Sequence, residues 1–359
     1  MSLKEPSSFR SQVEFVSSLP TLKKISSLLG FEPEQVVVIY DKKLRDHGET
    51  KSWLKRFPLS YPVSAGEKLK DLDYFPSHVR KVMKTLGASA PRNLCFVALG
   101  GGTVGDFVGF LASIYKRGVP LIQIPTTFLS ALDSAHGGKT ALNVGSVKNQ
   151  VGSFYPSQAV VIVRSLLESL PRKQLQSASG ELIKMAFLKG GEFYHQVHNS
   201  QADDFAWLWE AMPQAVEAKY EIVDMDPLER TGQRQWLNLG HSLGHALEAH
   251  YALAHGTAVA YGLRFALEWS VHRGYLKAGE AEELLRLLQR RSHILSVEDF
   301  FSKHRKMSKR QMAKYISQDK KLTDSAHLNF IFLTELGKPL GKKVTLDSFL
   351  TEASRQGWL

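Results

Sequence analysis

The chain has 359 residues, of which 43% are hydrophobic and 23% charged, a composition typical of a folded globular protein and not of a disordered one. Its length predicts two domains, and its formal net charge of +11 is compatible with an anionic substrate, a nucleic acid or a membrane surface. The single cysteine, Cys95, excludes an intrachain disulfide and is expected to be a buried, inert thiol. Because no run approaches the roughly 18 apolar residues of a membrane helix and the N-terminus lacks a signal-peptide pattern, we expect a cytoplasmic protein.

Short β-branched runs alternate with amphipathic segments in the first half of the chain. Strands are expected at four runs, 36–40, 93–99, 119–125 and 159–163. Between the second and third runs, the segment TVGDFVGFLASIYKRG has helical periodicity and is closed by Gly118. Strand, helix and strand within about 30 residues form a βαβ unit, which predicts an α/β domain with a parallel sheet over residues 1–172.

A glycine-rich turn joins the second expected strand to this helix. Gly100, Gly101 and Gly102 would let the backbone turn sharply and approach a ligand closely. Amide groups at the start of the helix could then hold a pyrophosphate. The spacing is not that of the usual dinucleotide-binding motif, so a tight turn without a ligand is the alternative.

A polar, glycine-punctuated segment follows the third expected strand, over residues 126–152. We expect an irregular functional loop here, because long segments of this composition in a compact domain usually carry function. Two lysines and an amide within eleven residues suit a phosphate or a carboxylate, and a solvated loop is the alternative. The polar side chains that it offers are Thr126, Thr127, Asp133, Lys139, Lys148 and Asn149.

Helical spacing dominates after Pro171 and predicts a helical domain over residues 173–359, with a late strand at 327–333 and a final helix capped by Thr345. Glu181 and Lys184 are three residues apart in an apolar segment, and this spacing by itself favours a salt bridge on one helix face. The basic segment 300–315 indicates a surface helix face, and no nucleic-acid motif accompanies it.

The segment NLGHSLGHALEAH, residues 238–250, concentrates histidines. On a helix His241 and His245 would share one face, a common way to offer two imidazoles to one metal, with His255 as a candidate third ligand. His250 would lie about 140° around the helix from His245 and is expected at the surface. Spacing alone favours His241 with His245, and a structural histidine is the alternative for each. Gly240 and Gly244 would allow another backbone to approach closely.

Six motifs occur in the order seen in one family. They are GGGTVGD, IPTT, GGKTALN, GELIK, LNLGHSLGHALE and HGTAVAYG, and together they resemble the 3-dehydroquinate synthase family of the sugar phosphate cyclases. The resemblance covers essentially the whole chain and is densest from 96 to 263. It implies an N-terminal NAD-binding domain with a Rossmann-like parallel sheet and an all-helical C-terminal domain that binds zinc or cobalt. It also implies a homodimer acting on a small anionic sugar phosphate, with no nucleic-acid or membrane partner.

The resemblance also assigns residues and revises the expectation from spacing. It places the metal on Glu181, His241 and His255, and it places His245 beside the substrate. The positions that it assigns to NAD are Asp41, Glu67, Lys70, Gly101, Gly102, Thr103, Val104, Gly105, Asp106, Thr126, Thr127, Lys139 and Lys148. The positions that it assigns to substrate or catalysis are Asp133, Lys139, Asn149, Lys184, Lys219, Arg234, Asn238, Lys320 or Lys321, and Arg117, which would reach the phosphate in this subunit or in its partner.

The implied reaction belongs to the shikimate pathway. It converts 3-deoxy-D-arabino-heptulosonate 7-phosphate to 3-dehydroquinate and phosphate through transient oxidation by NAD, phosphate elimination, re-reduction and intramolecular aldol closure. The chain departs from the family pattern where Val144 replaces a histidine, Gly145 a proline and Thr257 a glutamate. Since sister cyclases differ in the loop around Val144, another sugar phosphate is the alternative substrate. An alcohol dehydrogenase of the glycerol dehydrogenase type is a further alternative.

Overall fold

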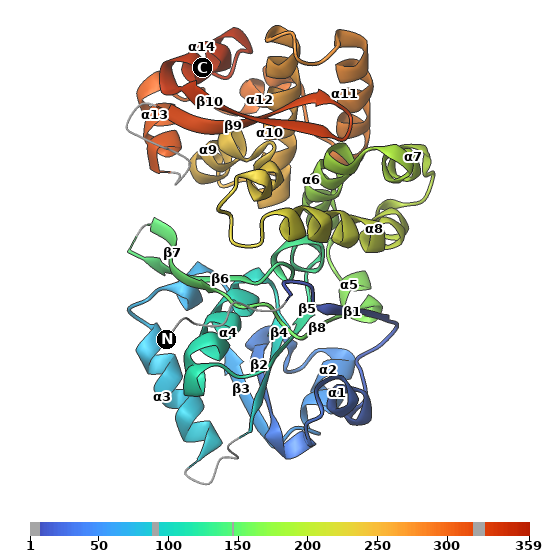
Figure 1. Ribbon diagram of the computed structural model, residues 1–359, viewed down its shortest axis with the longest axis vertical. Coiled ribbons are helices and arrows are strands. Elements are labelled where there is room, and N and C mark those ends of the chain that lie inside the picture. Colours follow the sequence, from blue (N-terminus) through green and yellow to red (C-terminus); the bar gives the residue numbers. More distant parts are fainter. Residues whose placement is uncertain (1–7, 88–92, 146, 319–326) are drawn as a thin grey trace. The chain divides into compact units, whose positions relative to one another are not determined.

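The computed structural model describes residues 8–87, 93–145, 147–318 and 327–359 (Figure 1). Its internal contacts divide the chain into two compact units, Met1–Leu170 and Pro171–Leu359. Within the described ranges, no helix combines the length and apolar character needed to cross a bilayer.

A parallel six-stranded sheet forms the centre of the N-terminal unit, in the spatial order β1–β8–β5–β4–β2–β3. Its strands are β1 (Gln12–Val16), β2 (Val36–Asp41), β3 (Leu59–Val63), β4 (Cys95–Gly100), β5 (Leu121–Pro125) and β8 (Ala159–Val163). The four central strands are those expected from their continuous apolar runs, which reflect burial on both faces. The edge strands β1 and β3 were not expected, because both are only partly buried and lack such a run.

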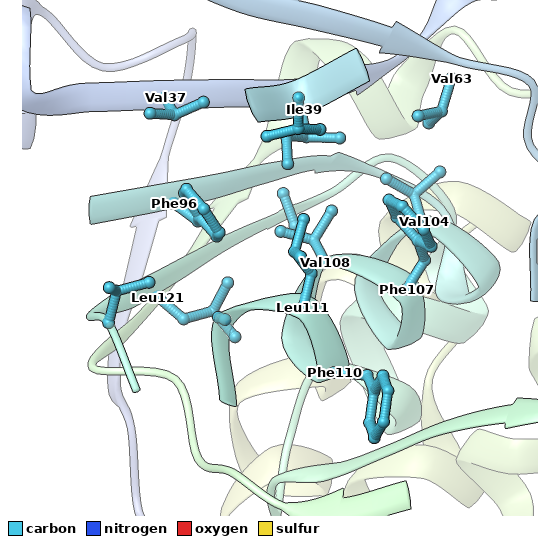
Figure 2. Packing of buried hydrophobic residues seen from close by; sticks show 14 of the residues in the cluster. Val37, Ile39, Val63, Phe96, Val104, Phe107, Val108, Phe110, Leu111 and Leu121 are labelled. Carbon is cyan, nitrogen blue, oxygen red and sulfur yellow. The ribbon is translucent and has the colours of Figure 1, made fainter. Parts of the chain in front are cut away.

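Helices cover both faces of this sheet (Figure 1). They are α1 (Leu22–Leu29), α2 (Gly48–Leu54), α3 (Phe75–Leu86), α4 (Gly102–Ile114) and α5 (Arg164–Glu168). Figure 2 shows one of the two cores, in which Ile39 and Phe96 of the sheet pack against Phe107 and Val108 of α4. The neighbouring strand residues point to the opposite face, where a second core contains residues of α1 and α2. The packing of this face of α4 against the sheet therefore holds the first turn of the helix next to the carboxyl end of β4.

The order of the strands reverses between β2 and β4. β2 is followed by β3 on one side, whereas β4 is followed by β5 on the other. Ligands of open α/β sheets bind at such a reversal, outside the carboxyl ends of the strands. Asp41 and Gly100 end these two strands, so the glycine-rich turn lies at the position where a ligand is expected.

An antiparallel hairpin replaces the irregular loop expected after β5. Its strands are β6 (Lys139–Val144) and β7 (Val147–Phe154). The hairpin packs closely on α4. A Cβ atom built on Gly109 of α4 would lie only 2.3 Å from Cγ2 of Thr140 in β6, so a larger residue would not fit there. The expectation of an irregular loop was wrong because most of β7 is exposed and polar and therefore has no apolar alternation.

The C-terminal unit is mostly helical but not all-helical as expected. The expected strand β9 (His327–Glu335) pairs with β10 (Lys338–Thr345) in an antiparallel hairpin. β10 was not predicted, because its sequence KPLGKKVT is largely exposed and polar. The capping of the final helix by Thr345 is confirmed, since its Oγ1 accepts the N–H of Ser348 at 3.1 Å. The helices are α6 (Arg172–Lys189), α7 (Gly191–Asn199), α8 (Asp204–Met225), α9 (His241–Tyr251), α10 (His255–His272), α11 (Ala278–Ser292), α12 (Val297–Lys303), α13 (Lys309–Gln318) and α14 (Leu346–Arg355).

The basic segment 300–315 does not form one helix face. It is split between the end of α12 and the start of α13, because α12 ends at Lys303 and α13 begins at Lys309. Its cationic side chains therefore do not form one continuous stripe of the kind that a nucleic-acid-binding helix presents.

Candidate functional site

Three helices of the C-terminal unit bring a carboxylate and two imidazoles together. Glu181 lies in the middle of α6, and His241 and His255 are the first residues of α9 and α10. Oε1 of Glu181 lies 3.2 Å from Nε2 of His255 and 3.5 Å from Nε2 of His241. The potential ligand atoms of the three residues all lie within 4.8 Å of one another. One carboxylate with two imidazoles is a common donor set for a catalytic zinc with positions left open for substrate.

Two glycines allow α6 and α10 to approach closely enough to form this cluster. Gly180 precedes Glu181, and Gly256 follows His255. A Cβ atom on Gly256 would lie 1.7 Å from the carbonyl oxygen of Ser177, and one on Gly180 would lie 2.0 Å from that of Gly256. Any larger residue would push the two backbones apart. The separation of Glu181 from His255 therefore depends on these glycines.

The close approach expected at Gly240 and Gly244 is confirmed. A Cβ atom on Gly240, whose φ is +79°, would lie 2.8 Å from the amide nitrogen of Leu263, and one on Gly244 would lie 3.1 Å from the carbonyl oxygen of Ala258. Both contacts are with α10. The glycines around His241 thus bring α9 against the helix that begins with His255.

The second nitrogen of each histidine is held by another group. Nδ1 of His255 lies 2.7 Å from Oε2 of Glu248, and Nδ1 of His241 lies 3.1 Å from the carbonyl oxygen of Leu239. These contacts direct both Nε2 atoms towards Glu181, an arrangement typical of metal-binding histidines. Burial alone would lower the pKa of His255, but the carboxylates of Glu181 and Glu248 outweigh it and raise the pKa to about 10. A metal ion binding here must displace a proton from His255.

The other two histidines of the segment lie outside the ligand group. The ring of His245 is centred 5.3 Å from that of His241 and 5.9 Å from that of His255. His245 therefore borders the cluster, although the pairing of His241 with His245 that spacing favours is not the one gathered here. His250 is half-buried and not simply a surface residue, since its Nδ1 lies 3.4 Å from the hydroxyl of Tyr315 on α13.

One buried cation contacts the cluster, and two more lie elsewhere in the same unit. Nζ of Lys184 lies 2.6 Å from Oε2 of Glu181, so the salt bridge expected from their spacing is confirmed. Lys219 on α8 and Arg234 on the 3-10 helix η6 (Gln233–Asn238) are also buried.

Asn238 ends η6 and is half-buried, three residues before His241. Lys320 and Lys321 lie outside the described residues.

The glycine-rich turn of the N-terminal unit has the features of an anion site. Gly101 is the N-cap of α4 and has no side chain that could occupy the first-turn amides. Space is tight there, since a Cβ atom on Gly101 would lie 3.2 Å from Cγ2 of Thr127. The amide of Thr126 donates to the carbonyl oxygen of Gly100 at 3.0 Å and fixes the neighbouring strand end. The first two turns of α4 contain Gly102, Thr103, Val104, Gly105 and Asp106.

A polar network links this turn to the β6–β7 hairpin. Nζ of Lys70 in the 3-10 helix η3 (Glu67–Lys70) lies 2.5 Å from Oδ2 of Asp106 and 2.6 Å from Oδ1 of Asn149. Nδ2 of Asn143 donates to Oε2 of Glu67 at 2.8 Å, and Oδ1 of Asn143 accepts the amide of Asn149 at 2.9 Å. Burial raises the pKa of Asp106, and the Lys70 ammonium opposes that rise. Residues assigned to NAD and to substrate thus share one set of hydrogen bonds.

The remaining residues of the N-terminal unit are not all gathered at this turn. Asp133 lies in the short turn Ser130–Ser134, near enough for its charge to raise the pKa of Asp106. Lys139 and Lys148 are exposed on the hairpin. Arg117 follows the C-terminus of α4 just before β5, so it lies at the amino end of the sheet, opposite the glycine turn.

Two polar contacts of the site were not expected from the sequence. Glu248 lies seven residues after His241, two helical turns along the same face, and this spacing was the available signal for it. Asn143 ends the motif GGKTALN, but its contact with Glu67 had no signal, because the strand pattern of this segment was itself not recognised.

Comparisons with known proteins agree in both units. A family model described as 3-dehydroquinate synthase N-terminal matches residues 60–177, and one described as 3-dehydroquinate synthase C-terminal matches residues 178–322. A 3-dehydroquinate synthase of Coxiella burnetii (strain Dugway 5J108-111) is 35% identical over 279 residues, which cover 76% of this chain and 75% of that protein.

Solved structures with the same fold include two sugar phosphate cyclases. A 2-deoxy-scyllo-inosose synthase complexed with carbaglucose-6-phosphate, NAD+ and Co2+ matches with a TM-score of 0.80 at 21% identity, over 98% of this chain and 99% of that one. A 2-epi-5-epi-valiolone synthase from Streptomyces hygroscopicus subsp. jinggangensis 5008, with NAD+ and Zn2+ bound, matches with a TM-score of 0.79 at 24% identity, over 99% of each chain. At these identities the two structures establish the fold.

Proposed function

The chain belongs to the 3-dehydroquinate synthase family, and we infer that it converts 3-deoxy-D-arabino-heptulosonate 7-phosphate to 3-dehydroquinate and phosphate. The observation that carries this inference within the molecule is the cluster of Glu181, His241 and His255, with the Lys184 ammonium on the second oxygen of Glu181. A metal-ligand set beside a buried cation suits a substrate that offers both hydroxyl oxygens and an anionic group.

A divalent metal would be held by Oε1 of Glu181 and by the Nε2 atoms of His241 and His255. The donor set fits this assignment, because the three atoms already face one another and both imidazoles are anchored through Nδ1. We propose zinc, with cobalt as a substitute, since related cyclases carry one or the other. When bound, the metal supplies a Lewis acid and NAD supplies reversible oxidation of a substrate hydroxyl.

The pyrophosphate of NAD would be held at the first turn of α4. Gly101 and Gly102 leave that turn open, and Thr103 accepts the amide of Gly66 at 3.0 Å, which supports the loop leading to Glu67. Asp41 ends β2 at the point where the strand order reverses, a position suited to the ribose hydroxyls of a dinucleotide. Its side chain also accepts the amide of Lys43 at 3.2 Å.

The residues of the C-terminal unit would bind and orient the substrate. Lys184, Lys219 and Arg234 are buried cations that suit its carboxylate and phosphate groups. Asn238 offers a neutral amide to the substrate hydroxyls. His245 borders the metal ligands without belonging to them, so it is the candidate for exchanging a proton with the substrate.

We further propose a homodimer in which Arg117 serves the partner's phosphate site. This is supported by its exposed position at the amino end of the sheet, away from the glycine turn of its own unit. Mixing Arg117→Ala subunits with His245→Ala subunits should restore part of the activity if the two sites are shared between subunits. No recovery in mixed dimers would overturn the shared site and leave Arg117 to its own subunit, and full activity of the Arg117→Ala homodimer would place Arg117 outside the active site.

Phosphate release tests the reaction itself. With NAD and zinc present, the protein should release one phosphate per heptulosonate phosphate consumed, without net NADH. Sedoheptulose 7-phosphate and glucose 6-phosphate are the comparison substrates. A higher kcat/KM with either would assign the chain to a sister cyclase reaction, and NADH accumulation with glycerol would indicate an alcohol dehydrogenase.

The departure at Val144 bears on this choice of substrate. Val144 ends β6 and is 42% exposed, and its side chain cannot form a hydrogen bond. Losing one neutral hydrogen bond to the substrate costs about 0.5–1.5 kcal/mol, roughly two- to tenfold in affinity. That loss raises KM but does not remove a reaction whose metal ligands and buried cations are retained. Val144→His should therefore lower KM for the heptulosonate phosphate.

A further inference from the structure

The loop that follows α8 is wrapped around one buried carboxylate. Asp226 is 2% exposed, and its two oxygens accept four consecutive or nearly consecutive backbone amides. Oδ1 accepts the amides of Arg230 at 2.7 Å and Thr231 at 3.1 Å. Oδ2 accepts those of Gly232 at 2.8 Å and Arg234 at 3.2 Å. One side chain therefore determines the path of the backbone over eight residues.

This carboxylate stays ionised across the pH range in which enzymes work. Burial alone would raise the pKa of Asp226, but the four amides stabilise the anion and bring the pKa down to about 2. Hydrogen bonds to a charged acceptor are stronger than neutral ones, so the loop is held firmly.

The same loop anchors Arg234 at both ends. The amide of Arg234 donates to Asp226, and its Nη1 group donates to the carbonyl oxygen of Pro227, the residue directly after Asp226. Arg234 is itself buried, at 2% exposure, and it lies near the start of η6, which continues to Asn238 and then to the first residue of α9, His241. The position of its guanidinium group thus depends on how the loop closes around Asp226.

We propose that Asp226 is a positioning residue for substrate binding, which acts by shaping the segment 227–234 so that Arg234 presents its guanidinium group to an anionic group of the sugar phosphate. This rests on the proposed function in one respect, the contact of Arg234 with substrate. Asp226 touches neither the substrate nor the metal ligands in this account. A guanidinium group must be held in a fixed orientation to bind a carboxylate or phosphate through two parallel hydrogen bonds, and the loop provides that orientation.

Asp226→Asn is the informative substitution, because it keeps the shape of the side chain. Its amide oxygen can still accept two of the four bonds, but its NH2 group would face two N–H donors and replace attraction with repulsion. Glu352→Gln is the matched control. Glu352 is also 2% exposed in the same unit, its pKa is also lowered, and its partners His272, Arg355 and Gln356 are not site residues.

The two variants should differ in KM and not merely in stability. Asp226→Asn should raise KM for the heptulosonate phosphate roughly tenfold or more, the usual effect of disturbing a charged hydrogen bond, and should change kcat by less than about threefold. Glu352→Gln should lower the melting temperature without raising KM. Faster hydrogen exchange in Asp226→Asn should be confined to residues 227–238. If Asp226→Asn and Glu352→Gln both only lower the melting temperature, Asp226 is structural and the proposal is wrong.

A double-mutant cycle with Arg234→Ala separates this proposal from the proposed function. If Asp226 acts through Arg234, Asp226→Asn adds no further rise in KM in the Arg234→Ala background. Additive effects would overturn the positioning role. An unchanged KM in Arg234→Ala alone would instead refute the substrate contact of Arg234. Should Asp226→Asn not fold, Asp226→Glu, which keeps the charge and moves it by one methylene, should give the same cycle with a smaller rise in KM.

Discussion

The ammonium group of Lys70 lies 2.6 Å from Oδ1 of Asn149, although 79 positions separate the two residues in the sequence. The same ammonium group lies 2.5 Å from Asp106 on the helix that follows the glycine turn. Lys70 therefore ties a helix proposed to bind NAD to a hairpin proposed to bind substrate. We expect binding of the two molecules to be coupled through this lysine.

Lys70→Met should weaken both kinds of binding. It removes the cation between Asp106 and Asn149, so NAD affinity should fall and KM for the substrate should rise, each by roughly tenfold or more. Lys68→Met is the matched control, since Lys68 is exposed two residues away and carries the same charge. Calorimetric titration with NAD and steady-state kinetics provide the two readouts. If Lys68→Met lowers NAD affinity and raises KM as much as Lys70→Met does, Lys70 contributes only its charge and not its contacts with Asp106 and Asn149.

Alanine substitution should identify the metal ligands. Glu181→Ala, His241→Ala and His255→Ala should each lose most of the bound zinc, because each removes one of three converging ligand atoms. His250→Ala should keep its zinc, since His250 contacts Tyr315 and not the cluster. Metal content per subunit after dialysis is the measurement. Comparable loss from His250→Ala would contradict the assignment.

Glu248→Gln should weaken zinc binding without removing a ligand. The Glu248 carboxylate holds Nδ1 of His255 at 2.7 Å, and loss of such a contact typically lowers metal affinity about 10- to 100-fold. Glu268→Gln is a suitable control, because Glu268 is similarly exposed and pairs with Arg264 on α10. Competition with a zinc chelator gives the dissociation constants. The idea fails if both variants retain the affinity of the unaltered protein.

Gly256→Ala should disrupt the approach of α6 to α10. Its new methyl group would lie 1.7 Å from the carbonyl oxygen of Ser177, so the backbones must separate, at a cost of about 1–3 kcal/mol or more. Zinc should be lost together with stability, because Glu181 and His255 move apart. Gly279→Ala in α11 meets no atom within 4 Å and should be neutral or slightly stabilising. A Gly256→Ala variant with normal melting temperature and zinc content would contradict this account.

Gly101→Val should prevent NAD binding. The Cβ position at Gly101 is already 3.2 Å from Thr127, so a branched side chain must fill the space above the first turn of α4. The C-terminal unit should still bind zinc, which shows that the chain is folded. Fluorescence titration with NADH is the measurement. Undiminished affinity in a zinc-loaded Gly101→Val protein would remove the nucleotide from this turn.

Local sequence patterns predicted much of the fold. The buried strands β2, β4, β5 and β8 have continuous apolar runs because both faces of the sheet are covered, and Thr345 caps the last helix through its own side chain. The strands β1, β3, β7 and β10 escaped recognition for the opposite reason. Each is partly or largely exposed, so few of its side chains need to be apolar. Its sequence therefore lacks the continuous apolar run that indicated the buried strands.

The chain itself determined which kinds of side chain the site would contain, and the family resemblance of its motifs already implied Glu181, His241 and His255 as a donor set. Only the tertiary structure decided how they meet. Spacing along one helix favoured His241 with His245, because sequence distance describes neighbours on a single element. The ligand atoms that converge come from three helices, held together by backbone contacts at Gly180 and Gly256. Such contacts depend on how helices pack, and packing involves residues far apart in the chain.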